Sequence, residues 1–276
     1  MAYDEPRARD STFGEELVER AAALPSASAE SAFRVADLCG DPLATPREIA
    51  EALSEDEALA SLVLHTANSA AVNWGPSIAD LPTAVVRLGL RFVGATALAA
   101  PGLGLLDGPA DDLWPARESL HRHAVCTGLV AQALAPAGID ADLALTAGLL
   151  HNIGLNLIAG FAPAEFGYLL ECGEQFWEAE DWIFGFSHSD LGAKLAAHWS
   201  YPADLVIAIS DHDIPDPRTP LARLVRLADL LVRDCGIGVE PRQALPPSEE
   251  ACGIDLEHAL EIVHTVLLPY ERPKTA

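Results

Sequence analysis

The sequence predicts an all-α protein. Apolar residues recur with helical spacing along almost the whole chain, and no extended run alternates between apolar and polar as a half-buried strand does. Ala and Leu, both strong helix formers, carry most of the apolar content, whereas aromatic residues make up only 6% of the chain. Half of the 276 residues are apolar, so the chain can bury a large core, which excludes extensive disorder.

Capping signals mark the first helices. Thr45 precedes Pro46 and stands three residues before Glu48, which predicts a helix start closed by a capping box. The same signal returns in residues 54–57, ahead of the apolar positions of the next helix. Residues 1–12 are polar and carry no such signal, so we expect them to be frayed.

A third helix and the segment after it delimit an N-terminal lobe. Asp80 is expected to cap this helix and Gly89 to end it. Its predicted apolar side consists of Val85, Val86 and Leu88. Residues 101–115 then change to Gly, Pro and Asp, which are typical of a connection, so we place the boundary between two helical lobes there.

Beyond this boundary the periodicity predicts long helices joined by short loops. We expect them over residues 116–135, 140–160, 163–182, 188–199, 202–212 and 219–235. A loop rich in Pro and Glu, 236–250, precedes a last amphipathic helix at 255–268. The predicted parts are a frayed N-terminus (1–12), a smaller N-terminal helical lobe (13–105), a larger helical lobe (106–235), and a C-terminal loop and helix (236–276).

Charge and composition exclude several kinds of partner and compartment. The 41 acidic and 17 basic residues leave a formal net charge of −24, whereas phosphates and anionic membranes require clustered Lys and Arg, so we expect neither nucleic acid nor a membrane as a partner. The most apolar stretch, 95–106, is interrupted by Pro101 and is too short to span a bilayer. The first twenty residues lack a signal peptide, and the five scattered cysteines never form C-x-x-C. A cytoplasmic protein is therefore expected.

Histidines within or at the ends of the predicted helices are the main candidates for chemistry. The order along the chain is His123, His151, His188, His212 and then Asp229. Imidazole and carboxylate groups are the usual protein ligands of Zn, Fe and Mn, and facing helices can direct several of them into one cavity. His121 and His123 are two residues apart on one helix and cannot both face such a cavity. A single helical histidine is more often structural, so only a pattern that links these positions supports a metal site.

Four local motifs supply that pattern. Residues 147–154 read A-G-L-L-H-N-I-G, 64–70 read L-H-T-A-N-S-A, 84–91 read A-V-V-R-L-G-L-R, and 186–192 read F-S-H-S-D-L-G. The first resembles the A-G-L-L-H-D-I-G signature of the HD superfamily of metal-dependent phosphohydrolases. The second and third resemble the L-R-x-A-N-S-A segment and the L-G-L-R helix of its HDOD branch, the HD-related output domain of bacterial signalling proteins. The resemblance covers about residues 24–232 and implies an HD-like multi-helix bundle with a smaller N-terminal helical lobe.

The resemblance implies a metal site with two departures. The superfamily's ligands fall on His123, His151, Asn152 and Asp229, and the further histidines of its two-metal members fall on His188 and His212. Asn152 stands where catalytic members have Asp, and Asp213 stands where a second His is common. A neutral amide holds a cation less well than a carboxylate does. We therefore expect no catalytic residue and no cofactor beyond a weakly bound divalent metal, and the histidines can alternatively form a hydrogen-bonded polar core.

Two functions remain open at this point. The eroded motif favours a non-enzymatic signalling or regulatory protein that binds a protein partner or a small ligand, with the binding surface between the lobes. The alternative is a metal-dependent phosphohydrolase that acts on a nucleotide or cyclic dinucleotide. The acidic surface disfavours so anionic a substrate unless the cavity gathers Arg87, Arg91 and Arg122. We expect a single module of unspecified oligomeric state, with its signalling input from another chain or a ligand.

Overall fold

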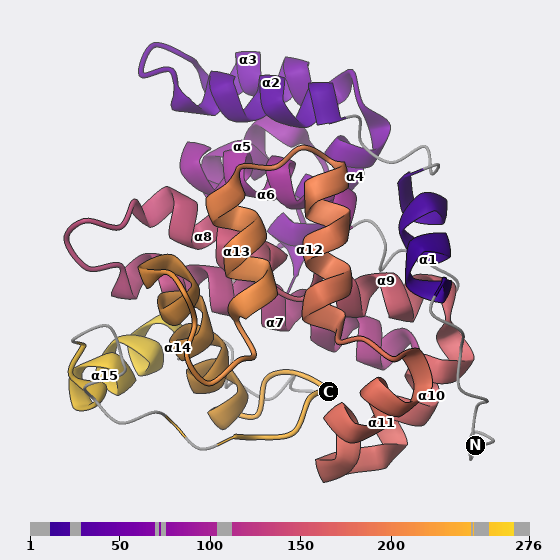
Figure 1. Ribbon diagram of the computed structural model, residues 1–276. Coiled ribbons are helices and arrows are strands. Elements are labelled where there is room, and N and C mark those ends of the chain that lie inside the picture. The colour runs from indigo at the N-terminus through magenta and orange to yellow at the C-terminus, as the bar shows by residue number, and fades with distance from the viewer. Residues whose placement is uncertain are drawn as a thin grey trace.

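The structure is a computed structural model that describes residues 12–22, 29–69, 72, 76–103, 112–243, 245 and 254–267. Every regular element in these ranges is a helix (Figure 1), which confirms the all-α prediction. The first six helices are α1 (Phe13–Ala22), α2 (Ala29–Gly40), α3 (Pro46–Ser54), α4 (Glu57–Asn68), α5 (Leu81–Leu88) and α6 (Leu90–Leu103). They are followed by α7 (Trp114–Leu134), α8 (Ala141–Leu150), α9 (Ile153–Phe161), α10 (Pro163–Cys172), a 3₁₀ turn η2 (Gly173–Gln175), α11 (Phe176–Phe184), α12 (His188–His198), α13 (Ala203–Asp211), α14 (Pro220–Asp234) and α15 (Leu256–Leu267).

The predicted helix starts in the N-terminal region are confirmed. The Thr45 hydroxyl accepts a hydrogen bond from the Glu48 N–H, and the Glu48 carboxylate accepts one from the Thr45 N–H, which completes the capping box of α3. Asp80 caps α5, and Gly89 ends it with a φ of +79°, a conformation that favours glycine. The predicted apolar side of α5 is wrong at Val86, which is 68% exposed. It lies one residue, or about 100° of helix rotation, from the buried Val85.

Three of the predicted boundaries differ from the observed ones. The helix predicted over 140–160 is divided at His151 and Asn152 into α8 and α9, and the one predicted over 163–182 is divided where Gly173 adopts a φ of +56°. The connection predicted over 101–115 begins later, because α6 continues to Leu103. Packing of α6 against α2 and α8 outweighs the one backbone hydrogen bond that a proline removes. Residues 104–111 of this connection lie outside the described residues.

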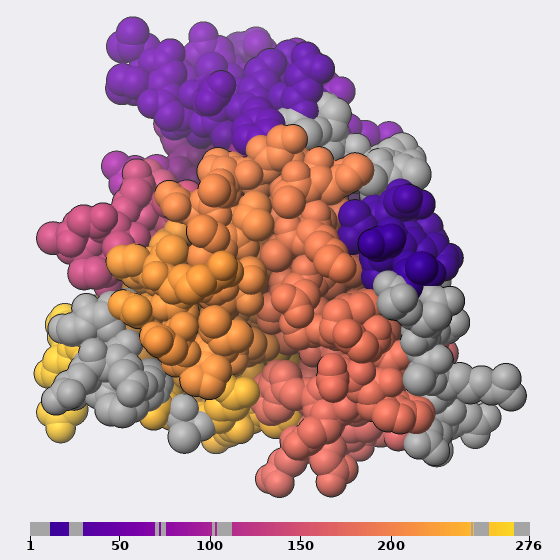
Figure 2. Space-filling model, in the orientation of Figure 1, coloured from indigo at the N-terminus to yellow at the C-terminus, as the bar shows by residue number. Residues whose placement is uncertain are grey.

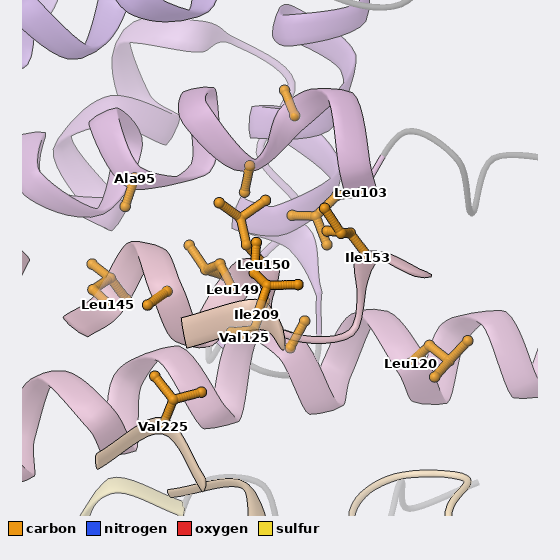
Figure 3. Packing of buried hydrophobic residues seen from close by; sticks show 14 of the residues in the cluster. Ala95, Leu103, Leu120, Val125, Leu145, Leu149, Leu150, Ile153, Ile209 and Val225 are labelled. Atoms are coloured by element: carbon orange, nitrogen blue, oxygen red, sulfur yellow. The ribbon is translucent and has the colours of Figure 1, made fainter. Parts of the chain in front are cut away.

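The core is built around α8. This helix is buried along almost its whole length between α6 on one side and α7 and α14 on the other, and Figure 3 shows its Leu149 and Leu150 among side chains of those helices. Together α8 and α9 (Ala141–Phe161) are long and apolar enough to cross a membrane, but 89% of their most apolar window is buried inside the fold. The span most able to cross a membrane is therefore a core element, and it differs from the 95–106 stretch, which the sequence indicates as the most apolar but too short to span a bilayer.

Helix α1 does not pack with the N-terminal helices that follow it. It lies against α9 and α12 (Figure 1), where the Phe13 ring stacks on Phe184 with centroids 6.0 Å apart. The Arg20 guanidinium lies 4.6 Å above the ring of Phe161. Helices α2 to α6 pack among themselves instead, and α6 joins them to α8. The predicted N-terminal lobe (13–105) therefore includes one helix that belongs to the surface of the larger lobe.

Gly148→Ala is expected to lower the free energy of unfolding by about 1–3 kcal/mol. A Cβ atom at position 148 would lie 2.6 Å from Gly128 Cα, which is main chain of α7 and cannot rotate away. Urea denaturation followed by circular dichroism measures the loss. Gly40→Ala is the matched control, because a Cβ there meets nothing within 4 Å. Equal effects of the two substitutions would contradict the close approach of α7 and α8 as their cause.

Candidate metal centre

Five helices bring the predicted site residues to one place. His123 lies in the middle of α7, His151 ends α8, His188 begins α12, His212 ends α13, and Asp229 lies in α14. These helices contact one another pairwise: α7 packs on α8 and α14, and α13 packs on α8, α12 and α14. Residues separated by more than one hundred positions in the sequence therefore meet in the interior of the larger lobe.

The first of two adjacent groups consists of His123, His151 and Asp229. The Nε2 atoms of the two histidines are 3.1 Å apart. Asp229 Oδ1 lies 3.0 Å from His123 Nε2 and 3.6 Å from His151 Nε2. All three side chains are buried. Two imidazoles and a carboxylate that converge on one point are a suitable donor set for a divalent metal.

The second group consists of His188, His212 and Asp213. Its two Nε2 atoms are 3.3 Å apart, and Asp213 Oδ2 lies 3.1 Å from His188 Nε2 and 3.7 Å from His212 Nε2. The rings of His151 and His212 have centroids 5.0 Å apart, so the two groups are neighbours. Asp213, which the sequence marks as a departure from the family pattern, is thus a carboxylate of this group.

Hydrogen bonds at the far side of each ring orient the histidines. His123 Nδ1 lies 3.0 Å from Ile237 O, and the Nδ1 atoms of His151 and His212 lie 2.7 Å from the carbonyl oxygens three residues earlier. A carbonyl oxygen can only accept a hydrogen bond, so Nδ1 carries the proton in each of these rings. In the neutral ring, Nε2 then has no proton and presents a free lone pair. Two such lone pairs 3.1 Å apart repel each other unless a proton or a metal ion lies between them. This outward bonding is also typical of metal-ligating histidines.

Asn152 adds an oxygen that fits a cation. Its Nδ2 donates a 2.8 Å hydrogen bond to Glu240 Oε2, while its Oδ1 is buried without a hydrogen-bond partner among the described residues. An orphaned buried acceptor is costly unless a cation or water satisfies it. The residues present therefore fit a divalent metal, held by His123, His151, Asp229 and Asn152 Oδ1.

Comparison with known proteins identifies the family. A family model described as the HDOD domain matches residues 24–215. The chain belongs to the HDOD family. It is 30% identical over 217 residues to an uncharacterised protein of Treponema pallidum (strain Nichols), which covers 73% of this chain. The chain spans only 40% of that relative's length.

Solved structures similar to this HDOD chain agree in fold. An HDOD domain protein of unknown function from Geobacter sulfurreducens matches 94% of this chain and 90% of its own, with a TM-score of 0.62 and 23% identity. A protein from Marinobacter aquaeolei VT8, provisionally named a signal transduction protein, matches 87% of this chain and 56% of its own, with a TM-score of 0.63 and 25% identity. At 23% identity, the similarity to the Geobacter sulfurreducens protein establishes the helical fold alone.

Three charged residues of the HDOD centre were not predicted from the sequence. Arg233 and Glu240 are buried beside the two His groups, and Glu180 lies behind His188, whose Nδ1 is 3.0 Å from Glu180 Oε1. The four-residue spacing between Asp229 and Arg233 on one helix is a signal that could have indicated Arg233. Glu240 follows no local pattern, because it lies in a segment that reads only as a connecting loop.

The buried charges shift the acid–base properties of the centre. Burial disfavours ionisation of Asp229, but the Arg233 guanidinium outweighs it and holds the Asp229 pKa well below its usual range. Burial also disfavours a charged His188, but the carboxylates of Glu180 and Asp213 outweigh it and hold its pKa well above the usual value. Asp229 is therefore held in its charged form.

His121 faces away from this centre, as its spacing from His123 predicts. Its ring meets that of His65 edge to face with centroids 4.7 Å apart, beside a small cavity lined also by Glu118 and Leu62. Burial, together with repulsion from His65, lowers the pKa of His121 to about 3. Because this value lies below that of an unfolded histidine, about 6.5, the fold favours the neutral ring.

His121→Leu is expected to weaken the loss of stability in acid. As the pH falls below about 6.5, the unfolded chain gains a proton at this position that the folded chain refuses until about pH 3. The native protein should therefore lose up to about 3 kcal/mol more than the variant between pH 7 and pH 4. Urea titrations at each pH measure the difference. Leu62→Ala, which changes the same cavity without a titratable group, should shift the whole curve and leave its slope unchanged; equal slopes in native protein and His121→Leu would contradict the assignment.

Proposed function

We propose that this HDOD protein is a non-enzymatic signalling regulator that binds a protein partner or a small ligand. The observation that supports it is the burial of the centre. The side chains of His123, His151, His188 and His212 are 0% exposed, and Asp229 is 1% exposed. A hydrolase needs an open coordination position where a metal-bound water meets the phosphoester, whereas a structural metal site is closed. The closed centre favours a structural role.

A divalent metal in this centre would act as a cross-link. The ligands that we propose come from α7 (His123), from the α8–α9 junction (His151 and Asn152) and from α14 (Asp229), so one ion would join three parts of the core. A bound ion would supply Lewis acidity, but its main effect here would be on stability, because it binds the folded chain alone. The neutral amide of Asn152 makes weak binding the expectation.

The ligand surface that we propose is a cleft between the lobes. It has a volume of about 370 Å³ and is formed by α2 and α6 on one side and by the start of α8 on the other. Arg91 of α6 lies 3.5 Å from Asp142 of α8 across it, and Cys39, Gly40 and Thr146 contribute to its lining. A volume near 370 Å³ is within the range of small-molecule sites. A ligand there would contact both lobes, which is what transmission of a signal between them requires.

A metal-dependent phosphohydrolase acting on a nucleotide or cyclic dinucleotide is the second candidate. It is favoured by the two adjacent His groups, each with a carboxylate, which together could hold two ions. Two solved structures from Shewanella amazonensis SB2B with provisional phosphohydrolase names share the fold, but at 24% and 20% identity they support the fold alone. The burial of the centre and the neutral Asn152 weigh against this candidate.

Metal titration and a turnover screen distinguish the two candidates. We expect the purified native protein to bind Mn²⁺ weakly and to show no hydrolysis of nucleotide phosphoesters or cyclic dinucleotides with added Mn²⁺, Fe²⁺, Ni²⁺ or Mg²⁺. Asn152→Asp is expected to tighten Mn²⁺ binding about tenfold or more, because a charged oxygen replaces a neutral one; second-shell changes alone alter affinity by roughly 10–100-fold.

In the absence of metal, Asn152→Asp should have a lower free energy of unfolding than the native protein. The new carboxylate would face Glu240 at the position where Asn152 Nδ2 now donates a 2.8 Å hydrogen bond, and two buried carboxylates repel each other. Asn152→Asp with Glu240→Gln is the control that should recover this loss. Turnover by the native protein would overturn the non-enzymatic proposal, and unchanged Mn²⁺ affinity in Asn152→Asp would exclude position 152 as a ligand.

Filling the cleft should abolish the effect of a small ligand. Gly40 lines the cleft and a Cβ atom there would meet nothing within 4 Å, so Gly40→Trp is expected to occupy the cleft without disturbing the core. Thermal-shift measurements with a panel of nucleotides, amino acids and polyamines should give compounds that raise the melting temperature of the native protein but not of Gly40→Trp. Ser61→Trp, an exposed position on α4, is the control. Compounds that stabilise all three proteins equally would place the site elsewhere, and a panel without effect would contradict the small-ligand part of the proposal.

A further inference from the structure

Arg233 connects the two His groups through their carboxylates. It lies on α14, four residues after Asp229, and its side chain is 1% exposed. Its Nη2 contacts Asp229 Oδ2 of the first group and lies 3.2 Å from Asp213 Oδ1 of the second. Its Nη1 lies 3.5 Å from Glu240 Oε1. One buried guanidinium thus contacts three carboxylates, two of which belong to different groups.

The carboxylates of Asp229 and Asp213 are shared between Arg233 and the histidines. Asp229 binds Arg233 through Oδ2 and lies 3.0 Å from His123 Nε2 through Oδ1. Asp213 contacts Arg233 through Oδ1 and lies 3.1 Å from His188 Nε2 through Oδ2. The guanidinium therefore stabilises negative charge on the same two side chains that would carry the charge for metal binding.

The charge carried by these groups limits how many cations they can balance. Asp229, Asp213 and Glu240 carry three negative charges, and Arg233 neutralises one of them. The remaining formal charge is −2, which one divalent cation would balance. Glu180 and His188 are left out of this count together, because the Glu180 carboxylate lies 3.0 Å from His188 Nδ1 and the two form an ion pair of their own. Asn152 adds no charge, and uncompensated charge in a protein interior is costly.

We propose that Arg233 takes the place of a second metal ion. The centre then holds one divalent cation, in the first group, and the guanidinium places one positive charge between Asp229 and Asp213, where a second ion would otherwise bind. The inference extends the proposed function, since it assumes that the His groups can bind a divalent metal. Removal of the Arg233 charge should open the second group, His188, His212 and Asp213, to an additional ion.

The test counts Mn²⁺ ions in the native protein and in Arg233→Gln. Equilibrium dialysis with metal analysis is expected to give one more equivalent of Mn²⁺ for the variant than for the native protein. Arg233→Lys keeps the charge and should bind the native number. Arg34→Gln is the matched control, because it removes an arginine whose ion pair, with Glu55, is exposed. Electron paramagnetic resonance gives an independent readout, since two adjacent Mn²⁺ ions couple magnetically and a single ion does not.

The outcomes separate this inference from the proposed function. One ion in the native protein and one more in Arg233→Gln, but not in Arg233→Lys, supports the inference. If the native protein binds none and Arg233→Gln binds one, Arg233 still excludes an ion, but the single ion in the first group and the metal part of the proposed function fail. Equal numbers in native protein and Arg233→Gln, or two ions in the native protein, overturn it. Should Arg233→Gln be unfolded without metal, Mn²⁺ is expected to restore a cooperative melting transition, and failure to do so also overturns the inference.

Discussion

The arrangement of the helices around the two His groups depends on the neutralisation of carboxylates that the fold buries. Asp213, Asp229 and Glu240 surround one guanidinium, that of Arg233, and Glu180 binds His188 from behind. Charges that are removed from water must find partners within a few ångströms. This requirement holds α7, α8, α12, α13 and α14 and the segment up to Glu240 in one arrangement, and Figure 2 shows α12, α13 and α14, in shades of orange, in the middle of the face it presents.

The same constraint connects the chemistry of the centre to the regulatory role that we propose. In an HD hydrolase the buried charge serves a reaction, because metal ions activate a water molecule there. In this HDOD chain the amide of Asn152 stands where the resemblance to that superfamily implies a carboxylate, Arg233 brings a positive charge, and the histidines are buried. Such a centre is suited to maintaining the shape of the lobe. A response to a ligand would then begin at the cleft between α6 and α8. The start of α8 lines this cleft, and the other end of the same helix leads to His151.

Local signals were sufficient for much of the fold. Thr45 and Asp80 mark helix starts because a capping side chain bonds to N–H groups two or three residues away, within the segment itself. The division of the predicted 140–160 helix was not accessible in this way, because helical apolar spacing continues on both sides of His151 and Asn152, and only the backbone of Asn152 (φ −99°, ψ +22°) leaves the helical conformation. Helix α1 has an apolar face that could cover either lobe, and only the packed structure shows that it covers α9 and α12.

The sequence by itself determined the helical class through the spacing of apolar residues, and it indicated the family and the set of histidines through local motifs that resemble those of the HDOD branch. Tertiary structure alone decided that Asp213 is a carboxylate of the second His group, that Glu240 reaches Asn152, and that Arg233 joins the two groups. The physical reason is the separation along the chain over which each kind of interaction acts. Capping and apolar periodicity act along the chain, whereas the balance of buried charge depends on which side chains meet in space, and Asn152 and Glu240 meet although 88 residues separate them.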